Sequence, residues 1–258
     1  MAEHFIIETH GLTKEFNGFL AVNDVNLRVR RGQIHALIGP NGAGKTTCFN
    51  LLTKFLIPTR GRILFKGEDI TFARAAEVAR RGMVRSFQMS AVFPHLTVLE
   101  NVRVALQPTL GTSFHFWGRG SSLAVLDPRA MQLLDAVGLV RFADTVAVEL
   151  PYGRKRALEI ATTLAMEPEL MLLDEPTQGM GHEDVDTVTA LIKRAAADRT
   201  VLMVEHNMNV VATIADTITV LQHGRIIADG SYAEVSQNPL VMQAYMGSTD
   251  SVLRGAHG

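Results

Sequence analysis

The stretch that decides the fold is IHALIGPNGAGKTTCFN, residues 34–50. IHALI predicts a buried strand, and the segment that starts at Lys45 predicts a helix. Between them, GPNGAGKTT carries Gly39, Gly44, Lys45 and Thr46 in the spacing G-x-x-x-x-G-K-[ST]. This spacing, placed between a strand and a helix, is typical of a loop that binds the phosphates of a nucleotide. We call residues 39–47 the phosphate loop.

The residue types of the phosphate loop suit the binding of ATP together with Mg²⁺. Glycines let successive backbone N–H groups converge on a phosphate chain, and the N-terminus of the following helix adds a partial charge of about half an elementary unit. Lys45 is expected to reach the β- and γ-phosphates, and the Thr46 hydroxyl is expected to bind Mg²⁺. The residues expected to contact ATP are Asn41, Gly42, Ala43, Gly44, Lys45, Thr46 and Thr47.

A second motif, ELMLLDEP at residues 169–176, is an apolar strand that ends in two adjacent carboxylates. By itself this pattern also fits a solvated strand end. Together with the phosphate loop it favours two chemical roles. Asp174 would hold Mg²⁺ through its water shell, and Glu175 would be the general base that polarises an attacking water.

The composition is that of an ordinary globular protein. Of the 258 residues, 47% are apolar and 20% are charged, which allows one large domain or two small ones. The net charge of -1 indicates no general attraction to nucleic acid or anionic membrane. The start, MAEHFIIETHGL, predicts no signal peptide, and no apolar run approaches the about 20 residues of a membrane span. The single cysteine, Cys48, predicts no internal disulfide.

Short apolar runs alternate with helix-periodic segments, which predicts an α/β fold. Strands are expected at residues 5–9, 26–29, 34–38, 63–65, 170–173, 200–204, 218–221 and 226–228. Helices are expected at residues 45–55, 97–106, 128–137, 154–166, 183–197 and 208–215. The strands at 34–38, 170–173 and 200–204 are apolar on both faces, which is typical of a parallel sheet covered by helices on both sides.

Two regions depart from this alternation. The first about 30 residues and GRILFKGEDI, residues 61–70, predict short antiparallel strands that form a side sheet. Residues 89–165 contain at least three helical patterns and no convincing buried strand, so we expect a helical subdomain inserted between the core strands. Within it, the irregular segment 108–128 contains the only tryptophan, Trp117. This segment fits either an exposed insertion or a surface that contacts a partner.

The order of the motifs resembles that of the nucleotide-binding subunits of ABC transporters over nearly the whole chain. It runs from the phosphate loop through Gln88 in VRSFQ, ELPYGRKRALEIA at 149–161 and MLLDEPT at 171–177 to His206 in VLMVEH. The resemblance implies a P-loop NTPase (RecA-like) fold with a parallel core sheet, an antiparallel β side sheet and an inserted helical subdomain. It also implies a single ABC ATPase domain over residues 1–258. In that domain, 1–88 and 166–258 would form the RecA-like core and β subdomain, and 89–165 the helical subdomain.

The resemblance assigns further roles by position. Phe16 would stack on adenine with Val22 beside it, although Phe16 also fits a core aromatic of the side sheet. Gln88 would join Mg²⁺ and the attacking water to the loop that faces the membrane partner. His206 would contact the γ-phosphate and position the water, whereas a lone histidine at a strand end is more often a polar cap. Catalysis would then rest mostly on positioning and charge stabilisation.

Subunits of this family act in pairs, with two ATP molecules held between the phosphate loop of one subunit and the signature turn of the other. The signature turn here is ELPYG at 149–153, so Tyr152 and Gly153 would contact ATP in trans. The family usually has a serine at the position of Pro151, and proline supplies neither a hydroxyl nor a backbone N–H. The loop at 177–184 would cross the dimer interface, and His182 within it fits a helix entry rather than a chemical role.

Among ABC ATPases, the chain is similar to those of branched-chain amino-acid importers of the LivG type. This similarity rests on Leu150, Tyr152 and Gly153, RSFQMSAVFPHLTVLENV at 85–102, the 108–128 insertion, VEHNM at 204–208 and the C-terminal segment from residue 223. ATPases of urea or amide importers share most of these features, and lipopolysaccharide-export ATPases generally lack the insertion. A soluble ABC ATPase acting on DNA or ribosomes is less favoured, because the chain has one cassette and near-zero charge. A module without turnover is less favoured because Glu175 and His206 are present.

The resemblance also implies partners and a location. The chain would pair with a second ABC ATPase subunit, as a homodimer or as a LivF-like heterodimer, and would drive two transmembrane permease subunits at the cytoplasmic face of the inner membrane. A periplasmic or surface substrate-binding protein would act through those subunits, and no nucleic acid is expected. The sequence contains no pattern for an amino-acid pocket, so specificity would reside in these partners.

Overall fold

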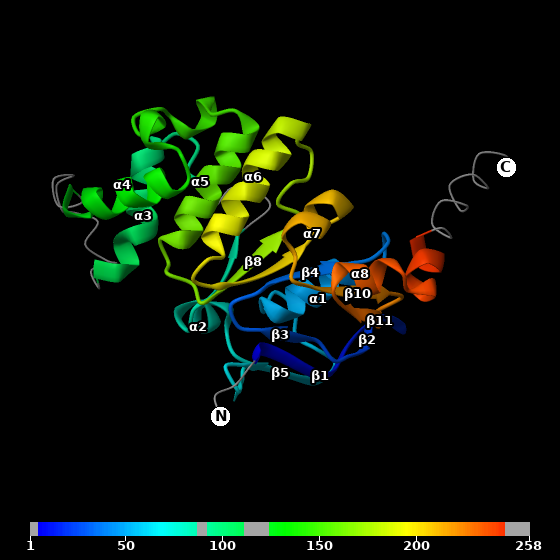
Figure 1. The fold of residues 1–258 in the computed structure, drawn as a ribbon. Helices are drawn as coiled ribbons and strands as arrows, with labels where there is room; N and C mark the ends of the chain where they lie inside the picture. Colours follow the sequence, from blue (N-terminus) through cyan, green and yellow to red (C-terminus); the bar gives the residue numbers. More distant parts are fainter. Residues whose placement is uncertain (1–4, 87–91, 111–123, 246–258) are drawn as a thin grey trace.

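The computed structural model describes residues 5–86, 92–110 and 124–245. Its centre is a six-stranded sheet in the order β11-β10-β4-β9-β8-β7, in which every neighbouring pair is parallel except β10 with β11. The strands are β4 (Ile34–Ile38), β7 (Met83–Ser86), β8 (Leu170–Asp174), β9 (Thr200–Val204), β10 (Thr217–Gln222) and β11 (Arg225–Gly230). The carboxyl ends of β4, β9 and β8 therefore meet at one edge of the sheet (Figure 1).

The central strands are buried on both faces, as the sequence predicts. Along β8, Met171 and Leu173 belong to the core shared with the helices, while Leu170 and Leu172 belong to the core shared with α1 (Lys45–Leu52). Because successive side chains of a strand point to opposite faces, a strand without polar residues must be covered on both sides. The helix α1, which follows the phosphate loop, covers one face of the central sheet.

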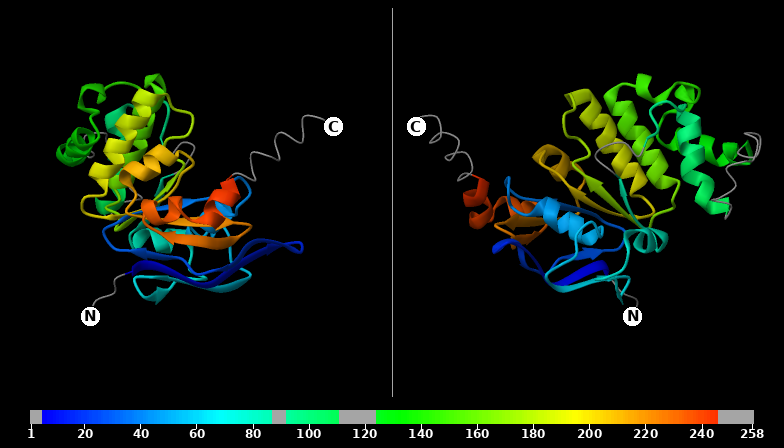
Figure 2. Two further views of the ribbon diagram at one scale, coloured as in Figure 1. Left: turned by 45° about the vertical axis from the view of Figure 1, so that its right-hand side comes forward. Right: turned by 180° about the vertical axis from the view of Figure 1, so that it is seen from behind.

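A second, antiparallel sheet lies beyond α1, so that α1 is enclosed between the two sheets (Figures 1 and 2). Its strand order is β2-β1-β5-β6, and β3 also pairs with β1. The strands are β1 (Phe5–Phe16), β2 (Phe19–Val25), β3 (Arg28–Arg30), β5 (Arg60–Phe65) and β6 (Glu68–Asp69). Lys66 and Gly67 turn the chain between β5 and β6 with positive φ angles of 53° and 78°. This is the antiparallel side sheet with a tight turn that the sequence predicts.

The helix α2 (Ala75–Arg80) lies on the same side of the central sheet as α1, because its buried Val78 belongs to the core that contains α1. The core on the other face contains the buried apolar residues of α3 (Val98–Leu106), α4 (Asp127–Ala136), α5 (Tyr152–Leu164), α6 (His182–Ala195), α7 (Met208–Ile214) and α8 (Tyr232–Ser236). Short 3₁₀ turns lie at Gln107–Leu110, Ala124–Leu126, Val140–Phe142 and Ala147–Glu149. The α3, α4 and α5 helices group at one end of the molecule, with α6 next to α5 (Figure 1). The division into a core and a helical subdomain at residues 89–165 stays a prediction.

The predicted α/β architecture with a parallel core sheet and an antiparallel side sheet is confirmed, with differences in individual elements. The strand predicted at 5–9 continues to Phe16, because β1 pairs with β2, β3 and β5 along its length. The predicted ranges lack β7, α2 and α8, which are short or carry polar residues among the apolar ones. The strand β2 lies within the first 30 residues, where short antiparallel strands are predicted without its bounds. The helix predicted at 45–55 ends at Leu52, since the Thr53 hydroxyl bonds to the Phe49 carbonyl and Lys54 has a φ of 65°.

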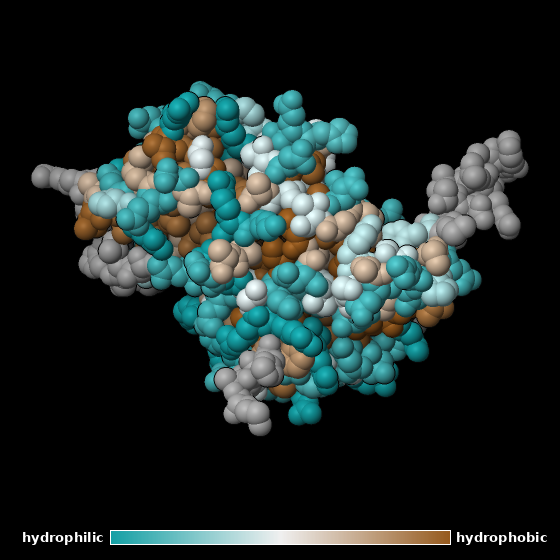
Figure 3. Space-filling view, viewed as in Figure 1, coloured by the Kyte–Doolittle hydropathy of each residue, from teal (hydrophilic) through white to brown (hydrophobic). Residues whose placement is uncertain are grey.

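Hydrophobic residues show in the middle of the face drawn in Figure 3, where the helical group meets the sheets, and the surface below them is mostly hydrophilic. None of the helices in the described parts of the chain combines the length and the apolar character needed to cross a bilayer.

Candidate active site

The phosphate loop follows β4 directly and depends on glycine at two close approaches. A Cβ atom on Gly39, whose φ is 150°, would lie 2.1 Å from the carbonyl oxygen of Leu221 in β10. A Cβ atom on Gly44, whose φ is 100°, would lie 2.3 Å from the carbonyl oxygen of Ala21 in β2. Real contacts of this kind do not occur, so a larger residue would displace the loop. The loop is thus held between one strand of each sheet.

Lys45 is the first residue of α1, and only 5% of its surface is exposed. Its Nζ atom donates hydrogen bonds to the carbonyl oxygens of Gly39, at 2.7 Å, and Pro40, at 3.0 Å. Burial lowers the pKa of Lys45, while the nearby negative charge of Glu175 acts in the opposite direction. The ammonium group therefore lies at the base of the loop and within electrostatic reach of the acidic pair.

The remaining residues of the phosphate loop differ in their accessibility. Asn41, Gly42 and Thr46 are exposed, Gly44 and Thr47 are partly buried, and Ala43 is buried. The Ala43 N–H donates to the Pro40 carbonyl at 3.2 Å, and its carbonyl accepts from the Gly224 N–H at 2.9 Å. Ala43 therefore contributes to the shape of the loop and to its attachment to the β10–β11 turn.

Glu175 and His206 meet at the carboxyl ends of the neighbouring strands β8 and β9. Oε1 of Glu175 lies 2.6 Å from Nε2 of His206. The Glu175 N–H donates to the carbonyl of Val204 at 2.9 Å, which ties the residue to the end of β9. Glu175 has a φ of 46°, a conformation that costs a non-glycine residue about 1 kcal/mol and that concentrates at functional sites. Two residues that are 31 positions apart in sequence thus form one hydrogen-bonded pair.

Asp174 is buried at the end of β8, and its Oδ2 atom forms an ion pair with Nη2 of Arg85 in β7. Nη1 of Arg85 also donates to Oδ1 of Asn50 in α1 at 2.8 Å. The guanidinium lies over the rings of Phe49 and Phe55, at 5.4 Å and 5.3 Å from their centres. The sequence analysis did not single out Arg85, and no signal was available, because β7 carries no pattern that distinguishes it as a strand.

The oxygen donors near the phosphate loop are suited to Mg²⁺. Mg²⁺ prefers oxygen ligands and usually uses one or two protein groups together with substrate phosphates. The hydroxyl of Thr46 and the carboxylate of Asp174 are donors of this type. Within the described ranges, no group of three or more His, Cys, Asp or Glu side chains could hold a metal ion by itself. The third predicted ligand, Gln88, lies outside the described residues, as does Trp117.

Phe16 lies at the end of β1, opposite Phe19 of β2, and 42% of its surface is exposed. Nζ of Lys14 lies 5.1 Å from the centre of its ring. Phe16 is therefore not a core residue of the side sheet. Val22, in contrast, is fully buried in the core with α1, so its side chain presents no accessible surface to a ligand.

The signature turn leads into α5, with Pro151 as its N-cap residue. Pro151 has a φ of -56° and its carbonyl accepts from the Lys155 N–H at 3.0 Å, so the proline does not interrupt the helix. The Tyr152 hydroxyl donates to the Gln178 carbonyl at 3.2 Å. A Cβ atom on Gly153 would lie 2.5 Å from Oδ1 of Asp184, so glycine allows α5 to begin close to α6.

A further residue near this site is Glu205, which the sequence analysis did not single out. It lies between β9 and His206, and only 2% of its surface is exposed. Its carboxylate accepts hydrogen bonds from Thr177 and from the backbone of His206 and Asn207. The signal available in the sequence was a glutamate directly after the apolar run VLMV of a buried strand.

The phosphate loop after β4, the two acids at the end of β8 and the histidine just beyond β9 are arranged as the motif order of an ATP-binding cassette predicts. The profile of the ABC transporter family matches residues 22–178, and a profile described as branched-chain amino acid ATP-binding cassette transporter matches residues 225–251. The chain belongs to the ABC transporter family, as the motif order predicts.

Individual relatives define the subgroup more closely. The chain is 41% identical to the high-affinity branched-chain amino acid transport ATP-binding protein BraF of Pseudomonas aeruginosa and 39% identical to its counterpart LivG of Escherichia coli. Both alignments cover 94% of this chain and 98% of the relative. A solved ATP-binding cassette of an ABC transporter in its ADP conformation is 29% identical, with a TM-score of 0.82 over 95% of this chain and 100% of the other. The predicted similarity to the LivG type is confirmed.

Proposed function

We propose that this chain binds and hydrolyses ATP to energise an importer of branched-chain or related amino acids. The observation that carries the proposal is the 2.6 Å contact between Glu175 Oε1 and His206 Nε2, at the strand ends next to Lys45 and the phosphate loop. In this arrangement a base, a group that orients it and a cation for the phosphates lie together.

Each of these groups has a distinct part in the proposed reaction. The phosphate loop and Lys45 hold the β- and γ-phosphates by N–H groups and a positive charge. The carboxylate of Glu175 accepts a proton from the attacking water as the water oxygen bonds to the γ-phosphorus. The bond from that phosphorus to the β–γ bridging oxygen breaks in the same step, and the electron pair leaves with ADP, so the products are ADP and inorganic phosphate. A carboxylate can only accept hydrogen bonds, so the imidazole of His206 donates Nε2–H to Oε1 and orients the base.

Thr46 and Asp174 are the described residues proposed to hold Mg²⁺, with Gln88 as a further ligand. When bound, Mg²⁺ neutralises negative charge on the phosphate oxygens. The ion pair with Arg85 orients the Asp174 carboxylate through Oδ2, and the second oxygen of the same group can serve as an acceptor.

A second ATPase subunit is proposed to complete each nucleotide site, in a homodimer or in a LivF-like heterodimer. Phe16 would stack on adenine through its exposed ring, and Tyr152 and Gly153 would face the ATP of the other subunit. Because Pro151 replaces the family's serine, the donors left at the signature turn are backbone N–H groups at the N-terminus of α5. A heterodimer in which the partner carries a complete signature would compensate for this loss.

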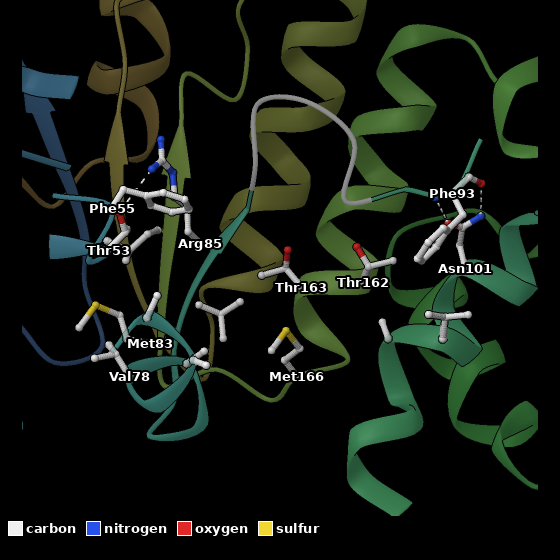
Figure 4. Close-up of a pocket in the computed structure, with 17 residues that line it drawn as sticks. Thr53, Phe55, Val78, Met83, Arg85, Phe93, Asn101, Thr162, Thr163 and Met166 are labelled. Carbon is white, nitrogen blue, oxygen red and sulfur yellow. Dashed lines mark hydrogen bonds between the residues drawn. The ribbon is translucent and has the colours of Figure 1, made fainter. Parts of the chain in front are cut away.

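A groove between α2, β7, α3 and α5 is the proposed contact with the permease subunits. Its volume is about 370 Å³, and most of the side chains that line it are apolar. Phe55 and Arg85 lie on one side, Phe93 and Asn101 on the other, and Thr162 and Met166 lie between them (Figure 4). Phe55 and Phe93 are exposed, as expected of residues that a partner covers. An amphipathic helix of a transmembrane subunit suits a groove of this character.

The cargo and the location are inferred from the relatives. BraF and LivG are named for branched-chain amino acid transport, and the profile match at 225–251 carries the same description. The subunit would lie at the cytoplasmic face of the inner membrane, and a periplasmic or surface substrate-binding protein would deliver the cargo. No contact with nucleic acid is proposed. A urea or amide importer and a lipopolysaccharide-type exporter are the alternatives.

Copurification followed by transport assays tests this function. The full chain, tagged and expressed with its native neighbours, should recover two membrane subunits and a second ATPase subunit. In proteoliposomes, the complex should transport leucine, isoleucine or valine in an ATP-dependent manner and should transport urea poorly. Recovery without membrane subunits would refute the transporter function, and transport of urea alone would refute the proposed cargo.

A further inference from the structure

Glu205 is a buried carboxylate that joins two separate turns of the chain. Oε1 accepts from the Thr177 N–H at 3.1 Å and from the Thr177 hydroxyl at 2.5 Å. Oε2 accepts from the backbone N–H groups of His206, at 2.8 Å, and Asn207, at 3.0 Å. Four donors therefore converge on one side chain that is 2% exposed.

The two turns are those that carry the groups of the proposed hydrolytic reaction. Thr177 follows two residues after Glu175 in the turn after β8, and His206 is the residue next to Glu205 after β9. Backbone pairing ends at Asp174 and Val204, where β8 and β9 stop. Beyond that point, the carboxylate of Glu205 holds one turn to the other in addition to the Glu175 N–H bond to Val204.

Only an ionised carboxylate satisfies this set of donors. A carboxylate has two acceptor oxygens and no donor, so each oxygen can receive two N–H or O–H groups. In glutamine, an NH₂ group would replace one oxygen and would face two donors, which leaves buried donors without acceptors. Aspartate keeps the charge, but its side chain is one methylene shorter, so its two oxygens cannot reach the donors of both turns at the same distances. The structure therefore favours this residue type, although Glu205 itself is assigned no contact with ATP.

We propose that Glu205 is a positioning residue of the hydrolytic centre. By holding the Thr177 turn and the His206 turn together, it sets the 2.6 Å contact between Glu175 and His206. This inference rests on the proposed ATPase function, since it concerns how that reaction is organised. It predicts that loss of the carboxylate slows the chemical step and leaves ATP binding intact.

The test compares Glu205→Gln with wild type in the assembled transporter, with Glu169→Gln as a control. Glu169 is also a carboxylate held by side-chain partners, but it precedes β8 at the end away from the site, where it pairs with Lys66 at 2.5 Å and Arg31 at 3.2 Å. We expect Glu205→Gln to lower kcat about 10-fold and to leave KM for ATP within about 2-fold. Glu169→Gln should leave kcat within about 2-fold. Glu205→Asp should recover part of the lost kcat.

A double-mutant cycle distinguishes positioning from a general structural effect. In a His206→Ala background, Glu205→Gln should lower kcat by less than about 2-fold, because the contact that Glu205 sets is already lost. Equal losses in both backgrounds, or a rise in KM that accounts for the whole effect, would overturn the proposal.

A second variant keeps the test decisive if Glu205→Gln does not fold. Thr177→Val removes one hydroxyl donor and keeps the backbone bond, so we expect a loss in kcat of about 3-fold with an unchanged KM. An unchanged kcat in Thr177→Val would then overturn the inference. Absence of ATP hydrolysis in the wild-type complex would instead refute the proposed function itself.

Discussion

Replacing Arg85 with methionine would leave the buried carboxylate of Asp174 without its cation. In the wild type, 12% of the Arg85 side chain and 4% of the Asp174 side chain are exposed. Methionine retains most of the apolar contact with Phe49 and Phe55 but carries neither the charge nor the donors to Asn50 and Thr53. The perturbation therefore isolates the polar role of the arginine.

The expected loss in the free energy of unfolding follows from the burial of the Arg85–Asp174 ion pair. Removing one partner of a buried ion pair costs about 3–5 kcal/mol, because the remaining charge is uncompensated. For a domain of this size, that loss corresponds to a decrease in Tm of about 10 °C. The exposed pair of Arg129 with Glu167, whose side chains are 49% and 68% exposed, provides the control. Arg129→Met should cost less than about 1 kcal/mol, or less than about 3 °C in Tm.

Thermal unfolding followed by circular dichroism measures both variants. Neutralising the remaining acid in the double variant Arg85→Met, Asp174→Asn should recover part of the lost stability, because asparagine does not carry the buried charge. A decrease in Tm for Arg85→Met no larger than that of Arg129→Met would refute the reasoning. A double variant that is less stable than Arg85→Met would refute the attribution to charge.

The remaining predictions concern the nucleotide site and pH. Glu175→Gln should lower kcat at least about 100-fold with ATP affinity retained, and wild-type turnover in this variant would remove Glu175 from the role of base. Lys45→Ala should weaken binding of a fluorescent ATP analogue about 10-fold or more, since a cation is lost from the phosphates. Pro151→Ser should tighten the ATP-dependent dimer several-fold, as measured by sedimentation in the Glu175→Gln background, and an unchanged association constant would contradict the role assigned to the missing serine. Burial lowers the pKa of His35 to about 4, against the opposing charge of Asp229, whereas the ordinary value is 6.5. The unfolded chain therefore takes up a proton below pH 6.5 that the folded chain does not, and the free energy of unfolding should fall by about 3 kcal/mol between pH 6.5 and 4. Denaturant titrations of wild type and His35→Gln should give a smaller decrease in the variant over this interval, and equal decreases would contradict this account.

The sequence predicts those parts of the site whose chemistry is local. The glycines of the phosphate loop, the buried strand before it and the helix after it are encoded within residues 34–52, so their pattern is readable without the fold. The same is true of the acid pair at the end of β8. In each of these cases, one segment contains both the motif and the backbone that presents it.

The short and polar elements were not predictable in this way. Strand β7 has the sequence MVRS, in which two apolar residues are followed by two polar ones. It therefore lacks the alternation of apolar and polar residues that indicates a strand. It forms because it pairs in parallel with β8, from Met83 with Leu170 to Ser86 with Leu173, although these residues are far apart in the sequence. Pairing of this kind is a property of the folded chain.

By itself, the sequence determined the parallel core, the phosphate loop, the acidic strand end and the membership in the ABC transporter family. The tertiary structure decided how the groups at the strand ends contact one another: Glu175 with His206, Asp174 with Arg85, and Thr177 with Glu205. These partners are 31, 89 and 28 residues apart. Periodicity and motif spacing describe neighbours along the chain, whereas contacts between turns depend on the order of strands in the sheet and on which polar groups burial forces to pair.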